Sequence, residues 1–234
     1  MERHQNQALT KPQAMVFDMD GTLFKTETLL IPVYHGVFDR LREEGLYQGE
    51  TPPQEIFLGC LGMLLSDIWQ KVIPNEEQHV HRRADELLLE LELKGLKELE
   101  SDLYPEVAST LLKLKEQGVA LFVASNGLEH YVKGVAEAHR ITELFGGIYS
   151  AGEYQTLSKV DLVKILLDRH ELDRIWMVGD RSSDVEAGKK NGQTVIGCDY
   201  AGFGQGEELR GSDVIIHDFT ELLQLYNEAL EVSE

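Results

Sequence analysis

The hydrophobic residues of this 234-residue chain follow two patterns, short unbroken runs and stripes at helical spacing. Unbroken runs are expected of strands that are covered on both faces of a sheet. Six segments have this pattern, at residues 14–17, 119–124, 147–150, 174–178, 194–197 and 213–216. Because helical stripes separate most of these runs, the chain is typical of successive β-α-β units and predicts a parallel sheet.

Start and stop residues support the helices between the runs. Pro105 fits a first helical turn, and Gly118 ends the stripe that follows it. Further stripes predict helices over residues 160–169 and 222–229. This alternation predicts an open, doubly wound α/β domain with a Rossmann-like sheet.

One long segment, residues 24–104, interrupts the alternation. It has helical stripes from Leu30 to Leu41 and from Val80 to Leu91, and no convincing strand run. A connection between a strand and a helix usually takes about 2–6 residues, so this segment is too long to be a loop. We predict an inserted all-helical domain there, with residues 1–23 and 105–234 forming the α/β core.

The charge of the chain limits its partners. Its 22 basic and 41 acidic residues give a formal net charge of −19, which repels nucleic acids and anionic membranes. The longest nearly unbroken apolar run, residues 56–65, is shorter than the ~20 residues of a membrane-spanning helix. Residues 1–13 have no apolar signal stretch, and Cys60 and Cys198 form no Cys-x-x-Cys pair. We therefore expect a cytoplasmic protein that binds neither nucleic acid nor membrane.

Two acids, Asp18 and Asp20, directly follow the first predicted strand. Functional residues of open α/β sheets gather at the carboxyl ends of strands, and Gly21 permits a sharp turn there. Acids at this spacing can bind one metal ion or divide nucleophilic and acid–base roles. A calcium loop is excluded because Leu23 and Leu29 stand where that loop requires Gly and Glu. Taken alone, the pair also fits a solvated turn.

Further polar residues follow two later strands. Asp180 and Asp184 are one helical turn apart, which suits a hard cation, although Asp184 alone also fits a helix N-terminal charge. Ser125 and Asn126 offer a hydroxyl and backbone N–H groups that can bind phosphate oxygens, although such residues also form ordinary turns. Lys159 precedes a predicted helix, where an isolated lysine is usually exposed.

Together these residues resemble the ordered motifs of the haloacid dehalogenase superfamily. The motifs are Asp18-Met19-Asp20-Gly21-Thr22, Ser125, Lys159 and Gly179-Asp180 with Asp184, and they extend over nearly the whole chain. The helical insertion is similar to that superfamily's cap domain. With residues 200–204 included, the chain is most similar to the phosphoglycolate phosphatase-like branch.

The resemblance implies a role for each residue. Asp18 would be the nucleophile that forms an aspartyl-phosphate, and Asp20 would be the general acid and base. Ser125, Asn126 and Lys159 would bind the phosphoryl group of the substrate. Dehalogenase members use neither a carboxylate at the position of Asp20 nor magnesium, so Asp20 favours phosphoryl transfer over carbon–halogen cleavage.

The resemblance also implies Mg²⁺ as the cofactor. Its ligands would be Asp18, the backbone carbonyl of Asp20, Asp180 and Asp184, with Asp184 bound either directly or through water. Together with Lys159, the ion would supply the positive charge that an acidic chain needs to attract a phosphate.

A second lysine could also be the lysine of the motif. In many relatives proline follows the motif lysine, whereas Val160 follows Lys159 here. Lys164 is the other candidate, but it would stand inside the predicted helix, so we favour Lys159.

Three functions fit these motifs. The leading prediction is a Mg²⁺-dependent phosphatase, monomeric or homodimeric, that hydrolyses a small phosphorylated metabolite. A phosphomutase of the β-phosphoglucomutase type would use the same motifs but would pass the phosphoryl group to a second hydroxyl. A non-catalytic regulatory protein on a phosphatase fold is disfavoured, because a site without activity has no reason to keep all four acids.

The helical insertion is expected to choose the substrate by closing over the pocket. Gly59, Gly62 and residues 65–69 are predicted to face the pocket. For each of these side chains, and for Trp69 in particular, burial in the helical core is the alternative.

Overall fold

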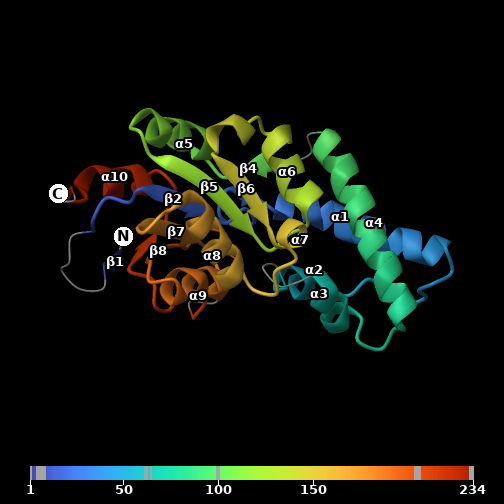
Figure 1. Cartoon of the computed structure of the whole chain (residues 1–234). Helices are drawn as coiled ribbons and strands as arrows, with labels where there is room; N and C mark the ends of the chain where they lie inside the picture. The colour runs from blue at the N-terminus through green and yellow to red at the C-terminus, as the bar shows by residue number, and fades with distance from the viewer. Residues whose placement is uncertain are drawn as a thin grey trace.

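The sheet of the computed structural model has the predicted parallel arrangement. The structure describes residues 2–3, 9–60, 63, 65–98, 101–202 and 207–231. Within them, one sheet has the order β1-β9-β8-β7-β2-β5-β6 (Figure 1). Its strands are β1 (Glu2–Arg3), β2 (Ala14–Phe17), β5 (Ala120–Ser125), β6 (Gly147–Ser150), β7 (Ile175–Gly179), β8 (Thr194–Cys198) and β9 (Val214–Ile216). All neighbours are parallel except β1, which pairs antiparallel with β9. The six predicted strands are confirmed, and β1 is an addition.

Helices cover both faces of this sheet, as a doubly wound fold requires. They are α5 (Val107–Glu116), α6 (Glu129–Ala138), α7 (Ala151–Tyr154), α8 (Lys159–His170), α9 (Ser182–Lys190) and α10 (Glu221–Glu228), with a 3₁₀ turn at Thr142–Leu144. Met15 and Phe17 of β2 belong to the hydrophobic cluster that includes residues of α5 and α10. Ala14 and Val16 belong to a second cluster, with residues of α8 and α9. Both faces of β2 are therefore covered, which explains its unbroken apolar run.

The segment between β2 and α5 is almost entirely helical. It contains α1 (Glu27–Glu43), α2 (Gln54–Leu58), α3 (Leu65–Val72) and α4 (Gln78–Lys97), which we call the helical insertion. The expectation of no strand is wrong at its two ends, where β3 (Phe24–Lys25) pairs antiparallel with β4 (Asp102–Leu103). Strands of two residues are too short to produce a periodic pattern, so the sequence did not predict them.

Aromatic side chains form the interior of the helical insertion. Tyr34 stacks on Phe57 with ring centroids 4.8 Å apart, and Phe38 meets Trp69 edge-on at 6.2 Å. All four rings are buried, and pairs of this kind add to the stabilisation from burial alone. α4 packs along α1 and also contacts α6 of the core (Figure 1). The aromatic interior of the insertion therefore continues into the hydrophobic cluster of the core, and α4 packs against α6.

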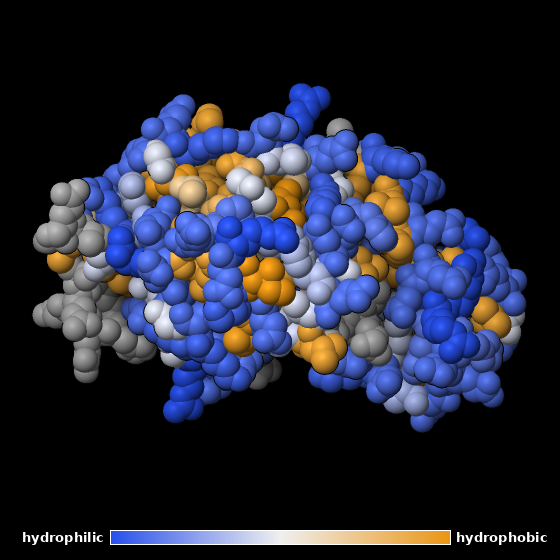
Figure 2. All heavy atoms as spheres, in the orientation of Figure 1, coloured by the Kyte–Doolittle hydropathy of each residue, from blue (hydrophilic) through white to orange (hydrophobic). Residues whose placement is uncertain are grey.

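The surface agrees with the acidic composition. Figure 2 shows one face that is mostly hydrophilic, with hydrophobic residues in scattered patches. No helix within the described ranges combines the length and the hydrophobicity that a bilayer crossing requires.

Candidate active site

The carboxyl ends of three neighbouring strands meet at one edge of the sheet. β2 lies between β5 and β7 and is parallel to both, so Asp18, Ser125 and Asp180 reach the same edge. The Asp18 N–H donates to the Val178 carbonyl at 2.9 Å, which extends the pairing by one residue beyond β2. The sheet thus brings together polar residues that are far apart in the chain.

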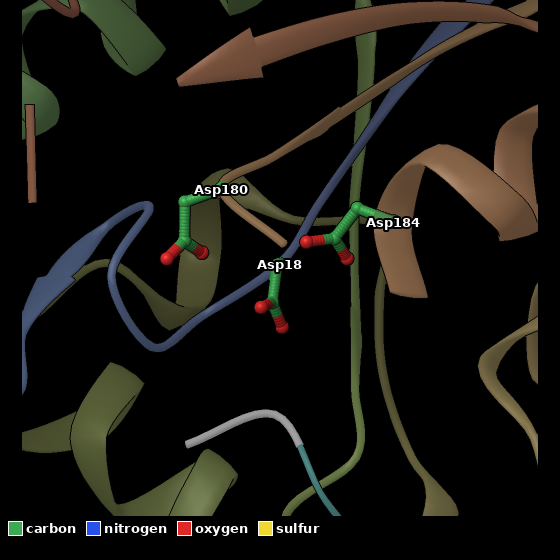
Figure 3. A group of neighbouring side chains, drawn as sticks. All are labelled: Asp18, Asp180 and Asp184. Carbon is green, nitrogen blue, oxygen red and sulfur yellow. The ribbon is translucent and has the colours of Figure 1, made fainter. Parts of the chain in front are cut away.

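Asp18, Asp180 and Asp184 form a buried acidic cluster. One carboxylate oxygen of each lies within 4.8 Å of the others, and Figure 3 shows the three carboxylates gathered around one space. Burial first, and then the charges of Asp18 and Asp184, raise the pKa of Asp180 well above its usual range. Burial also raises the pKa of Asp184 to about 6. The cluster therefore favours any cation that enters it.

Two glycines allow these acids to converge. A Cβ on Gly21, whose φ is +76°, would lie 2.3 Å from Asp180 Oδ2. A Cβ on Gly179 would lie 2.2 Å from the Asp184 Cγ. Both distances are shorter than any real contact, so a larger residue at either position would displace an acid. The motif glycines are thus required by the site as well as by the turns.

Lys159 is a buried cation that contacts two acids of the cluster. Its Nζ lies 2.9 Å from Asp18 Oδ1 and 2.6 Å from Asp184 Oδ1, and its side chain is 1% exposed. Burial alone would lower the pKa of Lys159, but the two carboxylates outweigh burial and raise it. Lys164, the alternative, pairs instead with the exposed Asp168. The structure therefore brings Lys159 to the acids and leaves Lys164 on the surface.

Asp184 has a structural contact in addition to its ion pair. Its Oδ2 accepts a hydrogen bond from the Arg181 N–H at 3.0 Å, which caps the first turn of α9. Asp184 therefore lies at the N-terminus of α9 and also belongs to the acidic cluster.

The side chain of Asp20 has different partners. Its Oδ1 accepts hydrogen bonds from Thr26 Oγ1 at 2.9 Å and from the Tyr131 hydroxyl at 2.6 Å. Burial raises the pKa of Asp20 above its usual value, and the two hydrogen bonds offset part of that rise. Neither Thr26 nor Tyr131 was among the predicted site residues.

Asp180 also accepts a hydrogen bond from a hydroxyl group. Thr22 Oγ1 donates to Asp180 Oδ1 at 3.1 Å, and the Tyr200 hydroxyl donates to the Thr22 carbonyl at 2.6 Å. Tyr200 belongs to the motif-like residues 200–204, of which residues 203 and 204 lie outside the described residues.

A cavity opens between this edge of the sheet and the helical insertion. It contains about 650 Å³ of space, including the part open to solvent. The core contributes Asp18, Asp20, Ser125, Asn126, Gly127, Leu128 and Tyr131. The insertion contributes Leu30, Phe57, Met63, Ile68, Leu88 and Glu92. Acids and hydrogen-bonding groups on the core side thus face mainly apolar side chains.

Residues 65–69 were predicted either to face the pocket or to be buried in the helical insertion, and both outcomes occur. Ile68 lines the cavity, whereas Trp69 is buried among the aromatic rings of the insertion. Gly62 and the side chains of residues 65 and 66 lie outside the described residues. Glu92, which was not predicted, is the acid that the insertion adds to the cavity wall.

The acidic cluster fits a hard divalent cation. It offers carboxylate oxygens from three residues in a buried space, and Mg²⁺ and Ca²⁺ prefer oxygen ligands. Three carboxylates share two cations, Lys159 beside Asp18 and Asp184 and Arg181 at 3.5 Å from Asp180, so negative charge is in excess there. A divalent ion would balance it.

Sequence comparison identifies the class to which this fold and site belong. The haloacid dehalogenase-like hydrolase family matches residues 15–198, from β2 to the end of β8. The chain belongs to this family.

Individual relatives are named as phosphoglycolate phosphatases. One from Haemophilus influenzae is 28% identical, over 89% of this chain and 96% of its own length. One from Aliivibrio fischeri is 31% identical, but that match covers 55% of this chain and 59% of the relative. Matches to the relatives from Vibrio cholerae and Vibrio parahaemolyticus each cover 57% of the relative, so the chain matches little more than half of these proteins.

Solved structures share the fold. A structure described as a predicted phosphoglycolate phosphatase from Haemophilus somnus superposes with a TM-score of 0.79 and 22% identity. That superposition covers 92% of this chain and 98% of the other, so core and helical insertion are both part of the common fold.

Proposed function

We propose that the chain is a Mg²⁺-dependent phosphatase that hydrolyses a small phosphate monoester through an aspartyl-phosphate on Asp18. The observation that carries this proposal is the position of Asp18. Its carboxylate belongs to the acidic cluster, contacts Lys159 at 2.9 Å and lines the cavity. An attacking carboxylate, a cation and a cavity thus coincide. The phosphatase relatives in the same family support the same chemistry.

In the first step, an Asp18 oxygen attacks phosphorus opposite the ester oxygen. The bond from Asp18 oxygen to phosphorus forms, the bond from phosphorus to the ester oxygen breaks, and Asp20 gives its proton to the departing alkoxide. Burial keeps the pKa of Asp20 above its usual value, which favours the protonated form that this step needs.

In the second step, water attacks the phosphorus of the aspartyl-phosphate. Asp20 takes up a proton from this water, Asp18 leaves as a free carboxylate, and inorganic phosphate is released. The Tyr131 and Thr26 hydroxyls hold Asp20 in one orientation during both steps. Ser125 and Asn126, on the core side of the cavity, bind the phosphoryl oxygens together with Lys159.

Asp18, Asp180 and Asp184 would hold Mg²⁺, together with the backbone carbonyl of Asp20. When bound, the ion supplies positive charge that stabilises the phosphoryl oxygens. Thr22 and Lys159 keep Asp180 and Asp184 in position.

We further propose that residues 24–104 act as a cap over the cavity and exclude bulk water. β3 and β4 would then be the two connections about which this cap moves, because they lie at its ends. Both cysteines are free and buried thiols, which supports a reducing cytoplasm as the location.

The test is phosphate release from a panel of small phosphate esters. The panel contains a sugar phosphate, a nucleoside monophosphate, phosphoglycolate and the generic ester p-nitrophenyl phosphate. We expect free phosphate with Mg²⁺, none in excess EDTA, and recovery when Mg²⁺ is restored. Full activity in EDTA would contradict the metal requirement. A sugar phosphate that isomerises without releasing phosphate would point to a mutase instead.

A further inference from the structure

Glu92 lies in an unusual place for an acid. It belongs to α4 of the helical insertion, one turn after Leu88, and both side chains line the cavity. Glu92 is 8% exposed, whereas most glutamates lie on the surface of a protein. Glu92 therefore lies on the insertion side of the cavity, and Asp18 and Asp20 lie on the core side.

The Glu92 carboxyl has no protein partner in the part of the chain that the structure describes. Among the residues that the structure describes, no hydrogen bond or ion pair reaches it. Burial, and then the negative charge of Asp20, raise the pKa of Glu92 well above its usual range. A buried polar group without a partner costs stability. Such a group is expected where a ligand supplies the missing partner.

The residues around Glu92 limit the charge that the ligand can carry. The insertion side of the cavity is otherwise apolar, and no Lys, Arg or His is among its described lining residues. Arg181, which lies outside the lining, contacts Asp180 at 3.5 Å and donates to the Leu58 carbonyl at 3.2 Å. On the insertion side, a second negative charge on the ligand would thus face Glu92 and apolar side chains, with no cation among the described lining residues.

We propose that Glu92 recognises the alcohol portion of the substrate by accepting a hydrogen bond from a hydroxyl or ammonium group. The substrate is then a phosphate monoester that carries a hydrogen-bond donor near the ester oxygen and no second negative charge. This inference rests on the phosphatase function proposed above. It assigns Glu92 as a specificity residue that contacts the substrate and takes no part in proton transfer.

We take Glu92 to be ionised in the substrate complex, because a donor bound to its carboxylate favours the charged form. An ionised carboxylate accepts hydrogen bonds through both oxygens and donates none, whereas a protonated carboxyl would also donate one through its O–H. The carboxylate of phosphoglycolate offers only acceptors, and its burial without a cation would be costly. Phosphoglycolate, the substrate in the names of the relatives, is therefore a poor substrate for this chain.

The first experiment compares four esters of nearly the same size with the full-length protein and Mg²⁺. They are 2-hydroxyethyl phosphate, 2-aminoethyl phosphate, ethyl phosphate and 2-phosphoglycolate. We expect kcat/KM for the better of the two donor-bearing esters to exceed that for phosphoglycolate roughly tenfold or more, with ethyl phosphate between them. An equal or higher kcat/KM for phosphoglycolate would overturn the inference.

The second experiment repeats the series with Glu92→Gln, a variant of nearly the same shape. Because its amide can donate to a carboxylate, the preference for the donor-bearing ester over phosphoglycolate should shrink at least about fivefold, mainly through KM. The matched control is Glu90→Gln, an exposed position on the same helix. An equal change of the ratio in both variants would contradict the role of Glu92.

The generic ester separates the two proposals. If p-nitrophenyl phosphate is hydrolysed but the four esters show no preference, only the Glu92 inference fails. If no ester is hydrolysed, the phosphatase function fails and the inference fails with it.

Discussion

The two walls of the cavity are built on different principles. On the core wall, Asp18 and Asp20 line the cavity, and Asp180 and Asp184 lie beside Asp18. Each of these acids has a partner: Lys159 for Asp18 and Asp184, Thr22 for Asp180, and Tyr131 for Asp20. On the insertion wall, aliphatic and aromatic side chains surround Glu92, which has no partner among the described residues.

This difference suggests that the core wall carries out the reaction and that the insertion wall recognises the substrate. The contacts on the core wall fix each acid before a substrate arrives, which is how preorganised sites stabilise a transition state. The insertion wall leaves a polar group for the substrate to satisfy. The core wall would therefore serve any phosphate ester, and the insertion wall would select among them.

The largest effect is expected on the core wall, from Lys159→Met. This change leaves Asp18 and Asp184 buried without the ammonium group between them. We expect phosphate release to fall at least about a hundredfold and the free energy of unfolding in EDTA to fall by about 3 kcal/mol. Steady-state kinetics and urea unfolding measure the two effects.

Lys164→Met is the matched control, because Lys164 is on the same helix and its pair with Asp168 is exposed. Such surface pairs contribute little, about 0–1 kcal/mol. Equal losses of activity in the two variants would contradict the assignment of Lys159.

A smaller effect is expected from Tyr131→Phe, a change to a side chain that lines the cavity on the core side. The change removes the 2.6 Å hydrogen bond to Asp20 and keeps the ring. We expect kcat to fall about tenfold, with a small change in KM, because Asp20 loses its fixed orientation. Tyr154→Phe is the control, since the Tyr154 hydroxyl contacts Arg169 outside the cavity. A kcat unchanged by Tyr131→Phe would remove Tyr131 from the site.

The smallest effect concerns the interior of the helical insertion. Asp85 accepts a hydrogen bond from Trp69 Nε1, and burial raises the pKa of Asp85 from 3.8 to about 6. A raised pKa means that the folded state favours the protonated acid. The stability contributed by this proton is complete below the ordinary pKa and is lost as the pH rises through about 6.

Asp85→Asn imitates the protonated acid. We expect it to stabilise the protein by about 1 kcal/mol near pH 7, allowing for the partial exposure of Asp85, and to change little near pH 4. Urea unfolding at the two pH values measures this difference, with Glu90→Gln as the exposed control on the same helix. Equal effects at both pH values would contradict the raised pKa.

Much of the core wall could be predicted from the sequence, because each acid follows an apolar run. Asp18 after residues 14–17 and Asp180 after residues 174–178 could be placed at one edge of a parallel sheet without coordinates. Lys159 was found through the motif order, and the structure brings its ammonium group to both carboxylates.

The partners of Asp20 could not be found in this way. Tyr131 is 111 residues from Asp20 in the chain, and no local pattern connects the two. Only the packing of α6 against the edge of the sheet brings them together. β1, β3 and β4 were missed for a different reason, because two residues show no alternation.

Glu92 did leave a signal in the sequence. It stands four residues after Leu88 and four before Leu96, on the buried face of α4. An acid in an apolar stripe violates the pattern of the helix, and such violations are expected at functional positions. The stripe was interpreted only for its apolar members.

The most direct test of the central claim, that Asp18 is the nucleophile, is phosphate release by Asp18→Asn with p-nitrophenyl phosphate and saturating Mg²⁺. The amide has the shape of the carboxylate but cannot attack phosphorus, so we predict a loss of at least about a thousandfold. Circular dichroism should show an unchanged fold. A variant that is folded and retains more than about a tenth of the wild-type rate would contradict the account.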